Sequence, residues 1–266
     1  MIPSSPVLLF DSGVGGLTVY DALREALPAA PVIYTADYAG IPYGKKTEAE
    51  VAARVAGLLG RMAERWQPRL ACIACNTAST IALGMVREVL EIPIVGTVPA
   101  IKPAAGVTSS GAIALVGTAA TIRQPYVDDL ESRFASDKRL VRIAAPDLVE
   151  LAEAKLRGRP VDLAPIKRVA DQIAGTPSPG AVDTIVLACT HFPLLTDEFA
   201  HVFGSSVTLV DGAQGIARRI AHLVEGQSFA PQAANRFVVT GPVETAAGLE
   251  AALAERGFGP VESFNA

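Results

Sequence analysis

The chain has 266 residues, of which 50% are hydrophobic and 19% charged, and a formal net charge of -4. This length allows one large domain or two small ones, and the apolar composition excludes a disordered or fibrous protein. The 23 basic residues are scattered, so the basic patch of a nucleic-acid binder is missing and a small-molecule partner is favoured. No apolar run is long enough to span a membrane, the start Met-Ile-Pro-Ser-Ser-Pro resembles no leader, and three cysteines cannot form a disulfide framework. These features predict a cytoplasmic protein with reduced thiols.

Short apolar runs rich in β-branched residues alternate with helical patterns along the chain. The clearest helix begins at Thr47, which forms a capping box with Glu50 before an amphipathic run. This alternation predicts an α/β fold, with parallel sheets covered on both faces by helices. Strands are expected at Val7–Phe10, Val32–Ala36, Leu70–Ala74, Ile94–Gly96, Ala112–Val116, Leu140–Ala144, Thr184–Leu187 and Thr208–Val210.

Two cysteines occupy similar places in two halves of the chain. Cys75 follows a strand in Ala-Cys-Ile-Ala-Cys-Asn-Thr, and Cys189 follows another in Val-Leu-Ala-Cys-Thr-His. The segment Lys102–Gly111 between them is rich in Pro, Gly and Ser, which indicates a boundary between two lobes. Because ligands bind beyond the carboxyl ends of parallel strands, we expect the two thiols to face each other across one pocket as acid/base catalysts.

The residues around each thiol suggest different protonation states. A free thiol has a pKa of about 8.5, and forming a useful thiolate near neutrality requires lowering it by about 1.5 units, or about 2 kcal/mol. His191 could supply this to Cys189 by a hydrogen bond, since two residues apart on an extended segment share one face. Asp11 would instead favour the protonated form of Cys75, unless it acts as a proton acceptor or relay. One thiol and one thiolate suit a two-base proton exchange.

The glycine-rich segment Asp11–Gly16 follows the first strand and precedes a helix, so it could bind an anion through backbone amides. A dinucleotide-binding oxidoreductase is the main alternative, with Asp37 at the right distance for a ribose carboxylate. Thr18 at the third glycine position and Asp11 where a pyrophosphate would approach count against it. A purely structural turn is a further interpretation.

Cys72 and Cys75 form a Cys-x-x-Cys motif, so a zinc-stabilised binding protein using Cys72, Cys75, Cys189 and His191 is a third hypothesis. Residues three apart on a strand point to opposite faces, which places Cys72 in the core. Asn76, Thr77 and Thr190 could bind a carboxylate beside the thiols or could cap helices. His201 and His222 lie in helical patterns and are assigned no role.

Five motifs together resemble the glutamate racemases of the aspartate/glutamate racemase superfamily: Phe10–Val19, Pro42–Gly44, Ala74–Ser79, Gly117–Thr121 and Ala188–Leu195. The resemblance extends from about residue 7 to residue 225 and implies a racemase without cofactor or metal. Cys75 would act on D-glutamate with help from Asp11, and Cys189 on L-glutamate with help from His191. It also implies that the substrate is held by Asp11, Ser12, Tyr43, Gly44, Asn76, Thr77, Thr118, Thr121, Glu153, Thr190 and His191.

The same resemblance implies two similar, doubly wound parallel-sheet lobes in pseudo-twofold relation, with the active site between them. We assign residues 1–99 and 209–266 to the first lobe, with Asp11 and Cys75, and residues 100–208 to the second, with Cys189 and His191. The family supplies D-glutamate for peptidoglycan, homodimers are common in it, and Val95–Pro103 resembles a subgroup whose activity can depend on a cell-wall precursor. Ala188 and Asp211–Ala213 depart from the family pattern without touching this chemistry.

Overall fold

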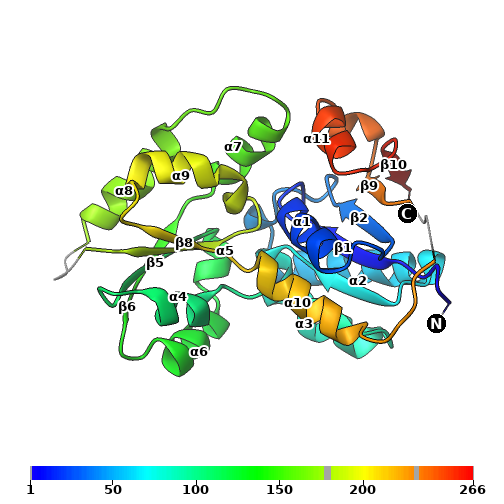
Figure 1. The fold of residues 1–266 in the computed structure, drawn as a ribbon, viewed down its shortest axis with the longest axis horizontal. Helices are drawn as coiled ribbons and strands as arrows, with labels where there is room; N and C mark the ends of the chain where they lie inside the picture. Colours follow the sequence, from blue (N-terminus) through cyan, green and yellow to red (C-terminus); the bar gives the residue numbers. More distant parts are fainter. Residues whose placement is uncertain (1, 177–180, 231–233, 266) are drawn as a thin grey trace.

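The computed structural model describes residues 2–176, 181–230 and 234–265. These residues form two separate sheets, one of six strands in the order β10-β9-β2-β1-β3-β4 and one of four in the order β6-β5-β7-β8 (Figure 1). Every strand pair in both sheets is parallel. The first sheet contains β1 Val7–Asp11, β2 Val32–Ala36, β3 Leu70–Ile73, β4 Ile94–Gly96, β9 Arg236–Thr240 and β10 Glu262–Phe264; the second contains β5 Ala112–Gly117, β6 Arg139–Ala144, β7 Thr184–Ala188 and β8 Thr208–Val210.

The two sheets repeat one strand order, which confirms the predicted α/β class with two similar parallel-sheet lobes. In each sheet the first strand lies between the second and the third, and the fourth is outermost on the side of the third. The third strands are β3 and β7, and each is followed by one of the two cysteines that the sequence predicts to face each other. Cys75 follows the end of β3 by two residues, and Cys189 immediately follows β7. The cysteines therefore occupy equivalent carboxyl edges.

Each sheet is covered by helices on both faces because its strands are apolar at successive positions. In β1, Val7 and Leu9 pack into the core on one face, and Leu8 and Phe10 into the core on the other. Burying each such side chain contributes roughly 1.5–3 kcal/mol. In the first lobe, one face of the sheet is covered by α1 Leu17–Ala26, α10 Ala213–Leu223 and α11 Glu250–Glu255, and the other by α2 Glu48–Trp66 and α3 Asn76–Val89. In the second lobe, one face is covered by α7 Asp147–Leu156, α8 Ala164–Ala174 and α9 Thr196–Phe203, and the other by α4 Ile101–Val107 and α6 Pro125–Phe134.

The capping box predicted at the start of α2 is present. The Thr47 side chain accepts a hydrogen bond from the Glu50 backbone at 3.3 Å, and Glu50 accepts one from the Thr47 backbone at 2.8 Å. Shorter helical segments complete the fold: α5 Ala119–Ile122 and the 3-10 turns η1 Tyr43–Lys45, η2 Phe192–Leu195 and η3 Val243–Ala246. Of these, η1 and α5 contribute residues to the cavity described below, and η2 begins directly after His191, which also lines it.

The chain passes from the first lobe to the second between β4 and α4, and returns between β8 and α10. The segment Lys102–Gly111, expected as the boundary, is largely helix α4, whose Ile101 and Ala104 are buried in the core of the second lobe. Proline is tolerated in a first helical turn, so Pro103 does not prevent this helix. Strand β8 pairs with β7, so residues 209 and 210 lie in the second sheet. Residues 1, 177–180, 231–233 and 266 of the expected lobes lie outside the described part.

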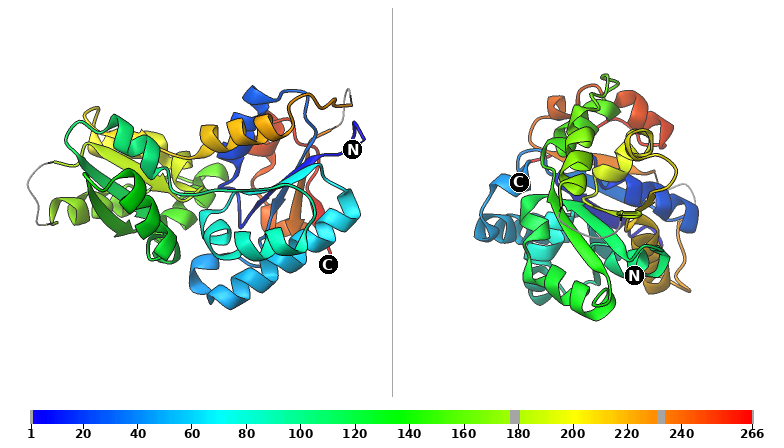
Figure 2. Two further views of the ribbon diagram at one scale, coloured as in Figure 1. Left: turned by 90° about the horizontal axis from the view of Figure 1, so that it is seen from below. Right: turned by 90° about the vertical axis from the view of Figure 1, so that its left-hand side faces the viewer.

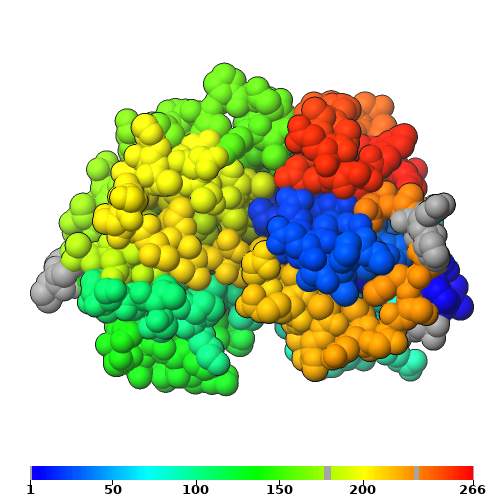
Figure 3. Space-filling view, in the orientation of Figure 1, coloured from blue at the N-terminus to red at the C-terminus, as the bar shows by residue number. Residues whose placement is uncertain are grey.

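The two lobes are distinct masses with both chain ends on the six-stranded lobe (Figure 2). The space-filling view shows them meeting along a seam that opens into a notch at one edge (Figure 3). None of the helices in the described part of the chain combines the length and the apolar character that crossing a membrane requires.

Candidate active site

A cavity of about 680 Å³ lies between the two lobes, and both Cys75 and Cys189 line it. The two sulfur atoms thus face one space, as their positions at equivalent strand ends require. Other lining residues come from both lobes: Ser12, Tyr38, Tyr43, Gly44, Lys45 and Thr77 from the first, and Thr118, Asp147, Glu150, Glu153, Arg157, Arg159 and His191 from the second.

Cys75 lies in an environment that favours the protonated thiol. It precedes the first residue of α3, and its sulfur lies 3.5 Å from the Ser12 hydroxyl. Burial, reinforced by the nearby charge of Asp11, raises the pKa of Cys75 to about 12 despite hydrogen bonds from the Ala78 backbone and Ser12. The thiol therefore carries its proton near neutral pH, as expected from the position of Asp11.

Cys189 lies beside a histidine instead. Its sulfur is 3.9 Å from Nδ1 of His191, whose Nε2 lies 3.0 Å from Oε1 of Glu153. Burial lowers the pKa of His191, but its interactions with Cys189 and Glu153 outweigh this and raise it well above 6.5. The sequence predicted this contact correctly, but it predicted an extended backbone at His191, and that is wrong. The backbone of His191 is helical (φ -72°, ψ -30°), and the turn into η2 brings the ring back to the sulfur.

Glu153 connects this histidine to the first lobe. Its Oε1 accepts a hydrogen bond from the Val14 backbone at 2.9 Å. Its Oε2 accepts a hydrogen bond from the Tyr38 hydroxyl at 2.9 Å and forms an ion pair with Arg157. Burial alone would raise the pKa of Glu153, but these partners and His191 lower it to about 2. The carboxylate is therefore ionised over the whole neutral range and faces a ring whose pKa it raises.

Asp11 is fully buried and joins the lobes rather than lining the cavity. Its Oδ1 accepts the Gly13 backbone N–H at 2.9 Å, and its Oδ2 accepts the Thr190 hydroxyl at 2.9 Å. Burial raises the pKa of Asp11, although the charge of His191 and these two hydrogen bonds oppose that. The side chain is fixed between the ends of β1 and β7, close enough to Cys75 to influence its proton affinity.

The glycine-rich loop is occupied by the protein itself, so the dinucleotide hypothesis is not supported. A Cβ on Gly13 would lie 2.2 Å from Oε1 of Glu153, and one on Gly15 would lie 2.6 Å from the His191 backbone nitrogen. The glycines at these positions let the second lobe approach the first. Because the Gly13 amide already binds Asp11 and the Val14 amide already binds Glu153, a pyrophosphate would have to displace the second lobe to reach this loop.

Asp37, the other element of that hypothesis, has a structural role. It is fully buried and forms a two-point ion pair with Arg54, at 2.6 Å for each nitrogen–oxygen contact. It also accepts hydrogen bonds from the hydroxyls of Tyr43 and Thr240. Its acceptor sites are therefore used within the first lobe, and through Tyr43 it fixes η1, which lines the cavity.

Three threonine hydroxyls meet across the seam. Thr77 at the start of α3 lies 3.0 Å from Thr118 and 3.1 Å from Thr121, and Thr118 and Thr121 are 3.0 Å apart. Thr118 also caps α5 through the Thr121 backbone at 3.2 Å. The cluster presents hydroxyl donors from both lobes, which suits a carboxylate. Thr77 and Thr118 line the cavity, and Thr121 lies behind them.

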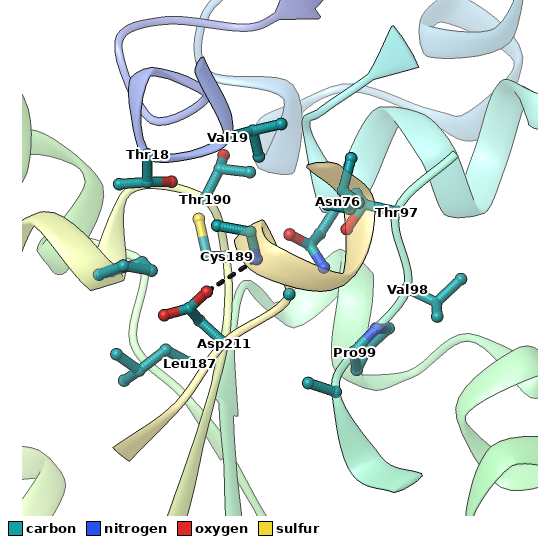
Figure 4. Close-up of a pocket in the computed structure, with 15 residues that line it drawn as sticks. Thr18, Val19, Asn76, Thr97, Val98, Pro99, Leu187, Cys189, Thr190 and Asp211 are labelled. Carbon is teal, nitrogen blue, oxygen red and sulfur yellow. Dashed lines mark hydrogen bonds between the residues drawn. The ribbon is translucent and has the colours of Figure 1, made fainter. Parts of the chain in front are cut away.

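Asn76 and Thr190, also predicted to bind substrate, lie on the other side of Cys189. With Thr18, Val19, Thr97 and Asp211 they surround a second pocket of about 10 Å³, enough for one water molecule (Figure 4). The structure therefore divides the predicted site residues. Those lining the large cavity are Ser12, Tyr43, Gly44, Cys75, Thr77, Thr118, Glu153, Cys189 and His191, and those behind it are Asp11, Asn76, Thr121 and Thr190.

Cys72 lies in the apolar core on one face of the first sheet, and Cys75 belongs to the core on the opposite face. The two sulfur atoms therefore cannot bind one ion from this segment, as the zinc hypothesis required. Burial, with a smaller contribution from Asp11, raises the pKa of Cys72 far above its ordinary value. Its place among Leu9 and Val95 is that of a small apolar core residue.

Tyr38 and Arg157 also line the cavity, and neither belongs to a motif that the sequence predicts to be part of the site. Glu153 and Arg157 stand four residues apart with opposite charges, which is a signal that the sequence does contain. The same spacing occurs on exposed helix faces, for example in the Asp129–Arg133 pair. Burial against Tyr38, which comes from the other lobe, is what distinguishes the site pair.

Comparison with known proteins agrees with this geometry. Residues 9–220 match the family model described as Asp/Glu/Hydantoin racemase. The glutamate racemase of Sphingopyxis alaskensis is 60% identical over 227 residues, 85% of each chain, and that of Salmonella typhimurium is 46% identical over 229 residues, 85% of this chain and 80% of the relative.

Solved structures resemble the whole chain. Escherichia coli glutamate racemase, in complex with L-glutamate and the activator UDP-MurNAc-ala, has a TM-score of 0.90 and 41% identity, covering 98% of both chains. Glutamate racemase from Thermus thermophilus, in complex with beta-chloro-D-alanine, has a TM-score of 0.76 and 30% identity, covering 100% of this chain and 98% of the other. With two thiols in one cavity between two lobes of matching strand order, the chain belongs to the Asp/Glu/hydantoin racemase family and is an isomerase.

Proposed function

We propose that the chain is a glutamate racemase that uses Cys75 and Cys189 as its two bases and needs no cofactor. The observation that carries this proposal is that both sulfurs line one cavity from opposite lobes. Similarity to glutamate racemases, at 60% and 46% identity to those of Sphingopyxis alaskensis and Salmonella typhimurium, supports glutamate as the substrate.

The proposed reaction exchanges one proton for another at Cα. In the L-to-D direction the Cys189 thiolate takes the α-proton: a new S–H bond forms, the Cα–H bond breaks, and its electron pair stays on the substrate. Cys75 then gives its thiol proton to the opposite face of Cα and becomes the thiolate. The reverse direction exchanges the roles, so the enzyme returns to its starting state after one turnover each way.

The surroundings of the two thiols support this division. Cys75 is held as a thiol by burial and by Asp11, so it is ready to donate. The His191 imidazolium lies 3.9 Å from Cys189 and can stabilise the thiolate on that side by a charge-assisted hydrogen bond. The hydroxyls of Ser12, Thr77 and Thr118 and the Tyr43–Gly44 turn line the cavity and would hold the substrate's carboxylates.

Isotope exchange at Cα tests the reaction directly. We expect L-glutamate or D-glutamate in deuterated water to lose optical rotation and to gain deuterium at Cα without any added cofactor. The product enantiomer should carry deuterium from its first appearance, because the proton it receives comes from the second thiol and not from the first. An enzyme that remains inactive until a nicotinamide or a metal ion is added would overturn the proposal.

We further propose that the product serves peptidoglycan synthesis and that a cell-wall precursor regulates the enzyme. The E. coli relative at 41% identity was solved with the activator UDP-MurNAc-ala, and Val95–Pro103 is the segment that carries the resemblance. The test is the racemisation rate with and without UDP-MurNAc-ala, with UDP-GlcNAc as the control nucleotide sugar. We expect the rate to rise tenfold or more with UDP-MurNAc-ala alone, which corresponds to about 1.4 kcal/mol of coupling. Equal rates in all three conditions would contradict this regulation.

A further inference from the structure

Arg157 joins both lobes at the wall of the cavity. Its Nη1 donates to the Glu153 backbone oxygen at 2.9 Å and to the Glu153 carboxylate. Its Nη2 donates to the Tyr38 hydroxyl at 3.1 Å and to the Thr245 backbone oxygen at 3.2 Å. Glu153 belongs to the second lobe, whereas Tyr38 and Thr245 belong to the first. The guanidinium therefore pairs with the Glu153 carboxylate inside the second lobe and ties that pair to the first lobe through Tyr38 and Thr245.

The arrangement leaves Arg157 few donors for a substrate. Both terminal nitrogens are used twice, the side chain is only 12% exposed, and the guanidinium lies 5.5 Å from the centre of the Tyr38 ring. The planar fork sends Nη1 to Glu153 and Nη2 to Tyr38 and Thr245, a division that a lysine ammonium could not reproduce. These contacts direct Arg157 at Glu153, although it lines the cavity.

We propose that Arg157 is a positioning residue that acts on Cys189 through Glu153 and His191. The chain of contacts is continuous: Arg157 to Oε2 of Glu153, Oε1 of Glu153 to Nε2 of His191, and Nδ1 of His191 to the Cys189 sulfur. By sharing the carboxylate's charge, Arg157 limits how tightly Glu153 holds the imidazolium proton and keeps the ring oriented at the thiol. For its effect on turnover, this inference rests on the proposed racemase reaction.

The sign of the effect follows from the charges around His191. The titratable groups that face it are Cys189, Glu153 with Arg157 and Tyr38 beyond it, and Asp11. Removing the Arg157 cation leaves the Glu153 charge uncompensated, so the pKa of His191 should rise further. Removing the Glu153 charge itself should lower that pKa. A purely structural contact would produce neither shift, and certainly not two of opposite sign.

Histidine NMR measures these shifts in the pKa of His191 without substrate. The chain has three histidines, so protein labelled at the ring carbon gives three ring signals, and that of His191 is assigned by its loss in His191→Gln. We expect R157M to raise the His191 midpoint by about half a unit or more and E153Q to lower it. R157K returns the charge and should leave the midpoint near that of wild type. The control is R133M, which removes an arginine from an exposed pair of the same i,i+4 spacing and should change nothing.

Kinetics provide the second readout. We expect R157M to lower kcat by about 10- to 100-fold, with KM for glutamate within about twofold, because Arg157 does not hold the substrate. R157K should recover part of this loss, since it restores the charge but not the fork. If R157M does not fold, R157Q serves as the neutral variant in both measurements.

Two results would overturn the inference. One is a folded R157M or R157Q in which His191 titrates as in wild type. The other is a KM raised tenfold or more with kcat unchanged, which would make Arg157 a substrate ligand. A wild-type enzyme without racemase activity would overturn the proposed function instead, while the NMR titration would still decide the role of Arg157.

Discussion

The hydroxyl of Thr190 donates a hydrogen bond to the carboxylate of Asp11 at 2.9 Å, although 179 positions separate the two residues in the chain. Asp11 ends β1 of the six-stranded sheet, and Thr190 follows β7 of the four-stranded sheet. This contact fixes the turn that contains Cys189 and His191 against the glycine-rich loop beside Cys75. The distance between the two thiols therefore depends on how the lobes meet and not on either lobe alone.

The three cysteines should differ sharply in their effect on turnover. Cys75→Ser and Cys189→Ser should each reduce kcat by about 10²- to 10⁴-fold, because a serine hydroxyl is a far weaker acid and base than a thiol. Cys72→Ser should leave kcat nearly unchanged, since Cys72 faces the opposite core. Circular dichroism of the glutamate solution measures the rates. Equal losses in all three variants would contradict the two-base assignment.

Gly13 should tolerate no side chain. A Cβ there would lie 2.2 Å from Oε1 of Glu153 and 3.0 Å from Nε2 of His191, so Gly13→Ala must displace the two residues proposed to assist Cys189. We expect a loss of about 10²-fold in kcat and roughly 1–3 kcal/mol of stability.

The matched control for that variant is Gly57→Ala in helix α2. A Cβ at Gly57 meets nothing within 4 Å, and alanine is the better helix former by up to about 1 kcal/mol. This control should therefore keep full activity and unfold at slightly higher urea concentration. An active Gly13→Ala enzyme would show that the second lobe does not dock on the loop as described.

Asp37 should matter for stability. Asp37→Asn would leave Arg54 without its charged partner and weaken the hydrogen bonds from Tyr43 and Thr240. Because Arg54 is 31% exposed, water compensates part of the loss, and we expect a decrease of about 2–3 kcal/mol in the free energy of unfolding. Urea denaturation measures it. Asp129→Asn, which breaks an exposed pair, should change stability by less than about 0.5 kcal/mol.

The ionised Glu153 should make stability depend on pH in acid. Its pKa lies at about 2 in the folded protein, below the ordinary 4.5, so its contribution is fully present above about pH 4.5 and is lost as the pH falls towards 2. The total is roughly 3 kcal/mol. In unfolding curves between pH 6 and pH 2, wild type should lose more stability than Glu153→Gln. Identical pH profiles for the two proteins would contradict the assignment.

The sequence predicted most of the first four strands of each lobe because parallel strands buried on both faces are nearly continuous apolar runs. It did not predict β9 and β10, although Arg-Phe-Val-Val-Thr in β9 has the composition of a strand. Strand β10 has only three residues, too few for a periodic signal. Strand β9 pairs with β2, which joins segments about 200 residues apart in the chain. Local sequence patterns cannot reveal such a pairing.

The sequence motifs predicted which residues belong to the site but not how these residues contact one another. The two cysteines, His191 and the threonines stand in recognisable segments, but the contacts that decide their chemistry cross between the lobes. Whether Glu153 faces solvent or His191 depends on docking that no sequence spacing encodes. Asp37 shows the converse: its place after β2 suited a ribose ligand, and only its buried pairing with Arg54 and Thr240 assigns it to the framework.

The two chain crossings between the lobes lie against each other, since a Cβ on Gly212 would be 3.6 Å from Oγ1 of Thr97. The four-stranded lobe therefore enters and leaves the rest of the protein at a single point, like a module inserted into a host. We expect that residues 97–212 can be exchanged for the matching piece of a relative without cutting either sheet. Such a chimera would carry the Cys75 half from one parent and the Cys189 half from the other, and its turnover would report how well the two halves fit.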